Sequence, residues 1–139
     1  MGDQIAKRVM VDMSATLIHH GHIRLLKYAA NLGSVVIGLA TDQEVLNTKG
    51  YLPELSYEER KEILLAIRYV DDVVPAPWII NDVFLEKHSV DVLVHGADNR
   101  NKVSLEKLRV LPRTEGISSS ELRKRVLEVA SICAVKELR

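Results

Sequence analysis

The sequence predicts a single α/β domain with three layers, in which a parallel sheet lies between helices on both faces. Apolar strand segments alternate with helical segments along the chain. The strand segments are apolar throughout and do not alternate in polarity, which is typical of parallel strands covered on both faces. A length of 139 residues, with 47% of them apolar, provides material for one core, so we place one domain over residues 1–139.

The elements follow in order from apolar runs, helical periodicity and caps. The expected strands are Val9–Ser14, Ser34–Ala40, Asp72–Val74, Asp91–His95 and Leu108–Leu111. The expected helices are His20–Leu32, Ser56–Tyr69, Ile80–Lys87 and Ser118–Leu138. Ser56 and Ser118 are each followed three residues later by glutamate, the capping-box signature of a helix start. Gly50 and Pro53 indicate a long loop between the second strand and the second helix.

Composition excludes several classes of partner. Nineteen basic and nineteen acidic side chains cancel, which argues against a broad nucleic-acid or membrane surface. The chain contains no long apolar span, so we expect a cytoplasmic protein. Its single cysteine, Cys133, lies among apolar residues of the last helix, where a packed thiol is expected and a disulfide framework is not.

The run His19-His20-Gly21-His22 stands where the first strand turns into the first helix. The first turn of a helix offers unpaired N–H groups and the positive end of the dipole, which together bind anions. Gly21 lets the backbone approach a ligand closely, and imidazole is a donor that becomes cationic near neutral pH. The run therefore suggests a phosphate site.

Two other interpretations of the histidines remain open at this point. Histidines near a helix start are often polar surface residues, and a short motif alone has a real false-positive rate. A zinc site is the second alternative, but one cysteine and the lack of an HExxH run disfavour it.

Further polar residues follow the other predicted strands. In open parallel sheets, ligands bind beyond the carboxyl ends of the strands. Thr41, Asp42 and Lys49 follow the second strand, Gly96-Ala97-Asp98 follows the fourth, and Arg113 to Ser118 follows the fifth. We therefore expect these segments to converge on the region of the histidines.

Four segments in order resemble the cytidylyltransferase family of the nucleotidylyltransferase superfamily. They are His19-His20-Gly21-His22 for HxGH, Lys49-Gly50, Arg68-Tyr69-Val70-Asp71 for RYVD, and Arg113 to Ser120 for RTEGIS[ST][ST]. The family includes glycerol-3-phosphate, choline-phosphate and ethanolamine-phosphate cytidylyltransferases. The resemblance covers nearly the whole chain and implies the Rossmann-like nucleotidylyltransferase fold.

The resemblance implies a set of site residues. His19, His22, Lys49 and Arg113 would be catalytic, contacting the phosphates and stabilising the transition state at the α-phosphorus of CTP. The residues implied to bind the nucleotide are Met13, Ser14, Ala15, Gly21, Arg68, Gly96, Asp98, Thr114, Ile117, Ser118 and Ser119. A small phosphate or phosphonate would accept CMP and pyrophosphate would leave, with Mg²⁺ as cofactor and its protein ligands unassigned.

The chain departs from the family at positions that the resemblance implies for triphosphate binding and for nucleotide or metal contact. Met13-Ser14-Ala15-Thr16 replaces a glycine-threonine-phenylalanine-aspartate run, and Ala97 replaces the first aspartate of a glycine-aspartate-aspartate run. The stretch from Met13 to His19 is similar to cytidylyltransferases that act on 2-aminoethylphosphonate or 2-hydroxyethylphosphonate. By contrast, the runs Val74 to Trp78 and Val94 to Gly96 resemble the choline- and ethanolamine-phosphate enzymes, so the resemblance leaves the acceptor open. The acceptor would lie near His95 and Trp78, although Trp78 is expected to belong to the core.

The resemblance also has implications for the oligomeric state and domain fusion of the protein, and two alternative functions stand beside it. The family is commonly homodimeric, and its phosphonate-specific members are sometimes fused to a phosphoenolpyruvate mutase. An adenylyltransferase of the same superfamily and a non-catalytic nucleotide-binding module are the alternatives. RYVD and RTEGIS favour cytidine over adenosine, and retention of both histidines and Lys49 favours an enzyme.

Overall fold

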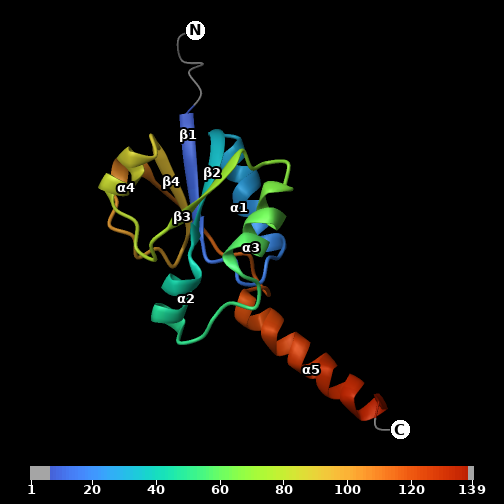
Figure 1. Ribbon diagram of the computed structural model, residues 1–139. Helices are drawn as coiled ribbons and strands as arrows, with labels where there is room; N and C mark the ends of the chain where they lie inside the picture. The colour runs from blue at the N-terminus through green and yellow to red at the C-terminus, as the bar shows by residue number, and fades with distance from the viewer. Residues whose placement is uncertain (1–6, 138–139) are drawn as a thin grey trace.

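A five-stranded parallel sheet forms the centre of the molecule, with helices on both faces (Figure 1). The computed structural model describes residues 7–137. The strands are β1 (Lys7–Met13), β2 (Gly33–Ala40), β3 (Asp72–Ala76), β4 (Val92–Gly96) and β5 (Leu108–Leu111). The helices are α1 (His20–Ala30), α2 (Asp42–Lys49), α3 (Tyr57–Leu65), α4 (Asp82–Lys87), the 3₁₀ helix η2 (Leu105–Lys107) and α5 (Ser119–Glu137). The predicted α/β class and parallel sheet are confirmed.

The strand order β3-β2-β1-β4-β5 places β1 at the centre of the sheet. The chain passes from β1 to β2 on one side and returns to β4 on the other, so the order reverses between β1 and β4. All strands run the same way, and their carboxyl ends share one edge, which we call the C-terminal edge. Ligands of such sheets bind at this reversal, outside the carboxyl ends.

Two apolar clusters hold the helices against the sheet. On one face, Val11 and Ile37 of the sheet pack with Leu26 of α1 and Leu64 of α3. On the other face, buried residues of the sheet pack with α4 and the segment before it; they are Met10, Val36, Ala76, Ile80, Leu85, Val90 and Leu93. The strands are buried on both sides, which explains why they are apolar throughout.

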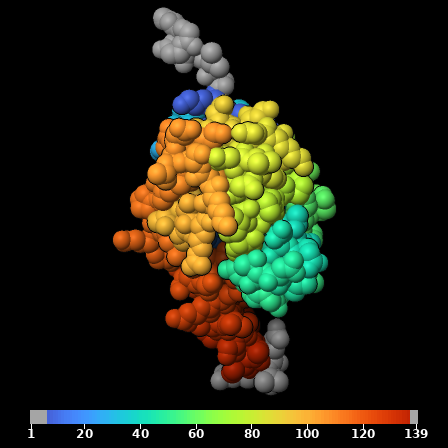
Figure 2. Space-filling model, turned by 90° about the vertical axis from the view of Figure 1, so that its left-hand side faces the viewer, coloured from blue at the N-terminus to red at the C-terminus, as the bar shows by residue number. Residues whose placement is uncertain are grey.

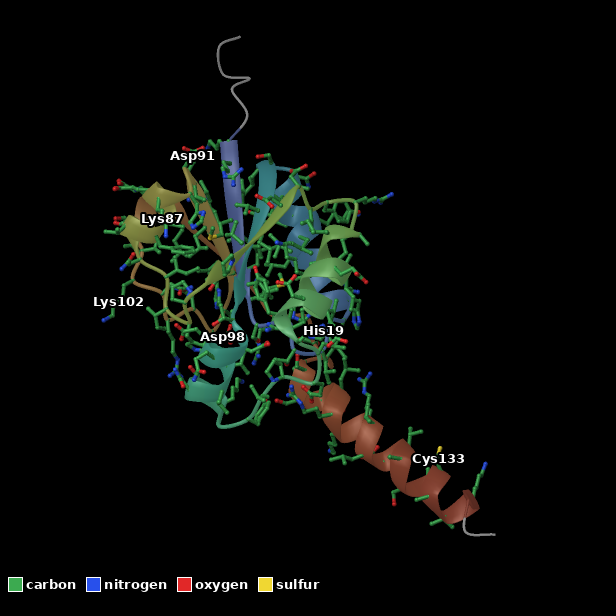
Figure 3. The ribbon with its side chains drawn as sticks, in the orientation of Figure 1. His19, Lys87, Asp91, Asp98, Lys102 and Cys133 are labelled. Carbon is green, nitrogen blue, oxygen red and sulfur yellow. The ribbon has the colours of Figure 1, made fainter. Side chains whose placement is uncertain are left out.

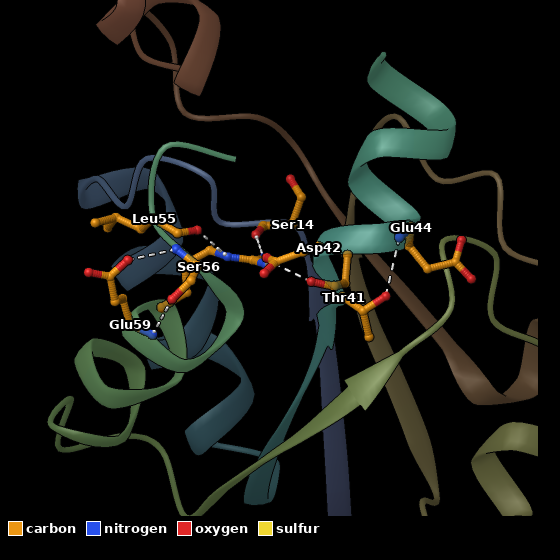
Figure 4. Close-up of polar contacts among 9 residues, drawn as sticks. Ser14, Thr41, Asp42, Glu44, Leu55, Ser56 and Glu59 are labelled. Atoms are coloured by element: carbon orange, nitrogen blue, oxygen red, sulfur yellow. Dashed lines mark hydrogen bonds and ion pairs between the residues drawn. The ribbon is translucent and has the colours of Figure 1, made fainter. Parts of the chain in front are cut away.

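A buried arginine ties four segments together at the C-terminal edge (Figure 4). Arg60 of α3 has no exposed surface. Its guanidinium donates to the carbonyls of Ser14 at 2.6 Å, Ala40 at 2.8 Å and Leu55 at 3.1 Å, and to Asp42 Oδ1 at 2.7 Å. Because each partner belongs to a different segment, Arg60 fixes the loop after β1, the end of β2, α2 and the start of α3 relative to one another.

The segment after β2 is a helix, and the prediction of a long loop there was wrong. α2 begins behind Thr41, whose Oγ1 accepts from the N–H of Glu44 at 3.2 Å. It ends at Gly50, which adopts a left-handed conformation with φ of +83°. Only Val45 of α2 is buried, so the helix has almost no apolar periodicity and depends on its caps.

Other element boundaries differ by a few residues from those predicted. α3 ends at Leu65, and the next N–H groups bond three residues back, Ile67 to Leu64 and Val70 to Ile67, so the chain tightens into turns. The expected helix from Ile80 begins at Asp82, because Asn81 is its cap. β3 extends through Pro75, which is tolerated because β3 is an edge strand.

Helix α5 projects away from the body of the molecule (Figures 1 and 3). Its apolar side chains are exposed, among them Leu127 at 71% and Ile132 at 59%. Cys133 is exposed as well, so the expected packed thiol is not found. The sequence context is apolar, but no other part of residues 7–137 covers the helix around Cys133. None of the described helices has the length and apolar character needed to cross a membrane.

Candidate functional site

Two histidines form the cap of α1. His19 is the N-cap residue, and its Nδ1 accepts from the N–H of Gly21 at 3.1 Å. His22 Nδ1 accepts from the N–H of His19 at 3.1 Å, so the pair reproduces a capping box with imidazoles in place of hydroxyl and carboxylate. The ring centroids lie 4.0 Å apart.

These hydrogen bonds determine which ring nitrogen carries the proton. Because each Nδ1 accepts a hydrogen bond, the neutral form of each ring is protonated at Nε2. Burial, followed by the charge of His19, lowers the pKa of His22 to about 4, and burial together with His20 lowers the pKa of His19. These lowered pKa values disfavour the expected cationic form near neutral pH, most strongly at His22, and the neutral rings offer Nε2–H donors.

Gly21 is required by the ring of His19. A Cβ atom at position 21 would lie 2.9 Å from both Cε1 and Nδ1 of His19, closer than side chains tolerate, and 3.5 Å from Cγ2 of Ile117. The sequence predicted a glycine that gives a ligand access to the backbone. The structure adds a second reason, since glycine leaves room for the imidazole that caps the helix.

The titration of His22 predicts a loss of stability in mild acid. An unfolded histidine titrates near 6.5, whereas the folded pKa is about 4. Stability is therefore complete above the unfolded value and declines as pH falls from about 6.5 toward 4, by about 3 kcal/mol in total. His95 acts with the opposite sign, because its pKa is raised and its contribution is lost as pH rises. As the pH is lowered from 7 to 4, we expect the urea midpoint of His22→Gln to fall less than that of the wild type. An equal fall in the two proteins would contradict this prediction.

The start of α5 lies beside the histidine loop. Ser118 Oγ accepts from the N–H of Glu121 at 3.0 Å, which confirms its predicted capping role. Ser119 Oγ donates to the carbonyl of Leu17 at 3.1 Å, and this bond joins the start of α5 to the loop before His19. Two helix N-termini, those of α1 and α5, thus stand at the same edge.

A chain of charged groups runs from β4 to the segment before α5. His95 Nε2 lies 3.7 Å from Asp98 Oδ1, and Arg113 Nη2 lies 3.9 Å from Asp98 Oδ2. Gly96 ends β4 between them in sequence. The structure therefore brings together the predicted residues of two strand ends, and Figure 3 shows Asp98 and His19 at the same end of the sheet, opposite Asp91.

The loop after β1 differs in sequence from the pattern that the resemblance implies, and burial and two arginine side chains fix its position. Ala15 is buried and has a positive φ of 47°, and the Ser14 carbonyl accepts from Arg60. Thr16, which replaces an acid, is 3% exposed, and its Oγ1 accepts from Arg123 Nη2 at 2.8 Å. Arg123 is also paired with Glu54. At the position where the resemblance implies a carboxylate, this chain therefore has the hydroxyl of Thr16, which accepts a hydrogen bond from an arginine of α5.

Lys49, at the end of α2, lies close to Trp78, which follows β3. Lys49 is the last residue of α2 and is exposed, and its Nζ lies 5.7 Å from the centroid of the Trp78 ring. This distance suits a cation–π contact. Trp78 is only half-buried, so its predicted place in the core is wrong. Figure 2 shows the teal surface of α2 against the yellow-green surface of the middle of the chain.

Arg68 does not join the other predicted residues. It lies before β3, at the amino-terminal edge of the sheet, and the histidines lie at the carboxyl-terminal edge. Its guanidinium donates to the hydroxyl of Tyr69 at 2.9 Å, which raises the pKa of Arg68. Within one chain, the role implied for Arg68 in nucleotide binding has no geometric support.

Three polar residues at the C-terminal edge were missed from the sequence. Arg60 and Arg123 form hydrogen bonds with segments that are distant in the sequence, and no sequence signal distinguishes them from surface arginines. Asp12 has a signal, because an acid inside the apolar run of β1 is unusual; it is only 8% exposed. Among residues 7–137, no three His, Cys, Asp or Glu side chains cluster closely enough to hold a metal ion.

The N-termini of α1 and α5, the imidazole N–H donors and Arg113 lie at one edge of a parallel sheet, an arrangement typical of α/β proteins that bind phosphate groups. The comparison with known families identifies which one. Residues 14–125 match the family model described as Cytidylyltransferase-like. The chain belongs to this family, which confirms the enzyme class that the four sequence segments predicted.

Named relatives agree with this assignment. Glycerol-3-phosphate cytidylyltransferase of Bacillus subtilis (strain 168) is 38% identical, with 86% of this chain and 97% of the relative covered. Ethanolamine-phosphate cytidylyltransferase of Mus musculus is 36% identical over 92% of this chain, but the match spans only 34% of that protein. Choline-phosphate cytidylyltransferase A of Rattus norvegicus is 33% identical over 95% of this chain and 40% of its own length.

A solved structure shows the same fold. It is the lipopolysaccharide core biosynthesis protein from Thermoplasma volcanium GSS1, with a TM-score of 0.66 and 19% identity. The match covers 79% of this chain and 99% of that one. At this level of identity the likeness concerns the architecture alone.

Proposed function

We propose that this protein transfers CMP from CTP to a small phosphate or phosphonate, with release of pyrophosphate. The observation that supports this most directly is the pair of Nε2–H donors of His19 and His22 at the helix N-terminus beside β1. The family assignment supplies the reaction class. The acceptor classes are glycerol 3-phosphate, phosphocholine, phosphoethanolamine, 2-hydroxyethylphosphonate and 2-aminoethylphosphonate.

The proposed step requires positioning more than acid–base chemistry. An acceptor oxygen forms a bond to the α-phosphorus, and the bond from that phosphorus to the β-phosphate oxygen breaks. Since the second pKa of a phosphate monoester is about 6, the nucleophile is already ionised near neutral pH. His19 and His22 donate to phosphate oxygens that gain charge, and Arg113 with the N-terminus of α5 binds the remaining phosphates.

Mg²⁺ enters this proposal as part of the CTP substrate. Mg²⁺ keeps several waters and binds phosphates with one or two carboxylates, so it needs no cluster of protein ligands. Asp98 is an exposed carboxylate near Arg113 and fits this limited role. The ion would neutralise phosphate charge that the two neutral imidazoles cannot.

Pyrophosphate release tests the proposal. CTP and ATP are compared in the presence of Mg²⁺ against each of the five acceptors. We expect release with CTP and at least one acceptor. Faster release with ATP would favour an adenylyltransferase, and CTP binding without release under any condition would favour a non-catalytic nucleotide-binding module.

Lys49→Ala should lower kcat/KM by roughly 10²-fold, because it removes a cation that reaches the phosphates from the end of α2. Alanine is a strong helix former, so α2 should persist. Pyrophosphate release measures the rate and circular dichroism checks the helix content. Lys27→Ala, an exposed lysine in the last turn of α1, is the matched control. An unchanged rate in Lys49→Ala would exclude the lysine from the reaction.

We also propose that the protein is a homodimer. Helix α5 exposes a row of apolar side chains, and burying them against a second copy of the chain would stabilise a dimer. They include Val126, Leu127, Val129 and Ile132. Sedimentation velocity should show a single dimeric species, and Val129→Glu combined with Ile132→Glu should shift it toward monomer. A wild-type monomer at all concentrations would reject the proposal.

A further inference from the structure

Helix α2 ends at Lys49, and the body of the protein holds this helix mainly at its other end. Its first residue, Asp42, pairs with the buried guanidinium of Arg60. Val45 is the only residue of α2 that is buried, and the last turn is exposed. The position of Lys49 therefore depends on how the chain is held after Gly50.

The segment that follows, Tyr51 to Leu55, is joined to α5 by the side chain of Arg123. Its Nε and Nη2 donate to the two carboxylate oxygens of Glu54, Nη2 to Oε1 at 2.9 Å. Its Cζ lies 5.1 Å from the centroid of the Tyr51 ring, which suits a cation–π contact. A bidentate pair fixes direction as well as distance, so Arg123 orients the segment and does not merely attract it.

Arg123 is itself fixed to the body of the molecule. Its Nη2 also donates to Oγ1 of Thr16 at 2.8 Å, and Thr16 is buried. At the start of the same helix, Ser119 Oγ donates to the carbonyl of Leu17 at 3.1 Å. The side chain of Arg123 is only 24% exposed. These contacts distinguish it from an isolated surface ion pair, which contributes little.

Apolar packing does not join the segment to α5 in the same way. An open hollow of about 500 Å³ lies between them, lined by Tyr51, Leu52, Glu54, Ser120 and Arg123. Leu52, the apolar side chain of this lining, is 63% exposed. Because side chains do not fill the hollow, the hydrogen bonds of the guanidinium set the separation of the two elements.

The far end of the Lys49 side chain lies against Trp78. Its Nζ is 5.7 Å from the centroid of the indole ring, and Trp78 is half-buried. Trp78 is the only tryptophan of the chain. Its fluorescence therefore reports on whether the lysine covers the ring, without any substrate.

We propose that Arg123 is a positioning residue for Lys49: through Glu54 and Tyr51 it holds the end of α2, so that the lysine ammonium stays at the C-terminal edge of the sheet. Arg123 acts through the segment that it orients. The inference rests on the proposed cytidylyltransfer, in which Lys49 reaches the phosphates. Misplacing a reacting or charged group by about 1 Å costs up to roughly 10²-fold in rate, so loss of the guanidinium should be measurable at the lysine.

A double-mutant cycle tests the connection to the lysine. Arg123→Met should lower kcat/KM for CTP, measured by pyrophosphate release with the best acceptor, roughly tenfold. In the Lys49→Ala background the same substitution should change the rate by less than about twofold, because the group that Arg123 positions is gone. A role in folding, or in the histidine loop through Thr16, would lower the rate equally in both backgrounds and would overturn the inference.

Glu54→Met separates the two contacts of the guanidinium. It frees the segment after α2 but keeps the bond between Arg123 and Thr16. We expect the rate loss of Arg123→Met, and no further loss when the two substitutions are combined. Lys124→Met removes a charge from the next, exposed position of α5 and should keep the wild-type rate. A wild-type rate in Glu54→Met would overturn the inference.

Acrylamide quenching of Trp78 fluorescence in the ligand-free protein gives a second readout. The quenching constant should rise in Lys49→Ala, where the ring loses its cover, and by a similar factor in Arg123→Met, whereas Lys124→Met should match the wild type. Wild-type quenching in Arg123→Met would reject the role of Arg123 and leave cytidylyltransfer in place. Absence of pyrophosphate release with every acceptor would reject the proposed function, and the quenching comparison would still show whether Arg123 holds the lysine.

Discussion

His19→Asn and His22→Gln should each lower kcat/KM by roughly 10²- to 10⁴-fold while leaving the unfolding midpoint close to that of the wild type. Asparagine is a good N-cap residue, and glutamine at the third helical position completes a capping box, so both variants keep the hydrogen bonds that begin α1. What they remove is the Nε2–H donor of each ring. The rate of pyrophosphate release with CTP therefore reports on the donors and not on the cap.

Alanine variants make this separation visible. His19→Ala loses both functions of the ring and should show the rate loss together with about 1 kcal/mol of lost stability. His20→Ala is the matched control, since His20 is exposed and takes no part in the capping box. Near-normal turnover in His19→Asn or His22→Gln would mean that the histidines serve only as caps.

The sequence predicted the strands well because their signal is local and strong. A strand buried on both faces must be apolar throughout, and all five strand segments were found within a few residues. The helix α2 was missed although Thr41 and Glu44 have the spacing of a capping box. Its apolar content is too low for periodicity, and the pair Lys49-Gly50, interpreted as part of a loop, is the end of the helix.

The candidate site was predictable where it depends on strand ends and unpredictable where it depends on side-chain partners. His19, His22, Asp98 and Arg113 follow strands and lie at the C-terminal edge of the sheet. The protonation of the histidines is set by backbone N–H groups that the sequence does not reveal, so their neutral state was not foreseen. Likewise, the packing expected for Cys133 follows from its apolar neighbours, but α5 leaves the body of the described chain.

Arg60→Met should destabilise the protein by about 3 kcal/mol, because buried carbonyl groups lose their hydrogen-bond donor, whereas Asp42, whose side chain is 38% exposed, can be solvated. Methionine fills a similar volume, so the loss comes from hydrogen bonds and not from a cavity. Three backbone carbonyls, those of Ser14, Ala40 and Leu55, lose their guanidinium donor, and Asp42 is left without its cation. Urea denaturation followed by circular dichroism measures the change.

The effect should be local as well as global, because the four partners of Arg60 position the C-terminal edge. Hydrogen exchange should accelerate first in α2, which has one buried residue and depends on Asp42 and Ala40 for its attachment. Arg60→Lys keeps the charge but has too few donors for four partners, so its stability should lie between wild type and Arg60→Met. Arg24→Met, at an exposed position of α1, should be nearly neutral. A loss below about 1 kcal/mol in Arg60→Met would show that the loop after β1 and α2 hold their places without the arginine, and that the site edge is organised by the strands alone.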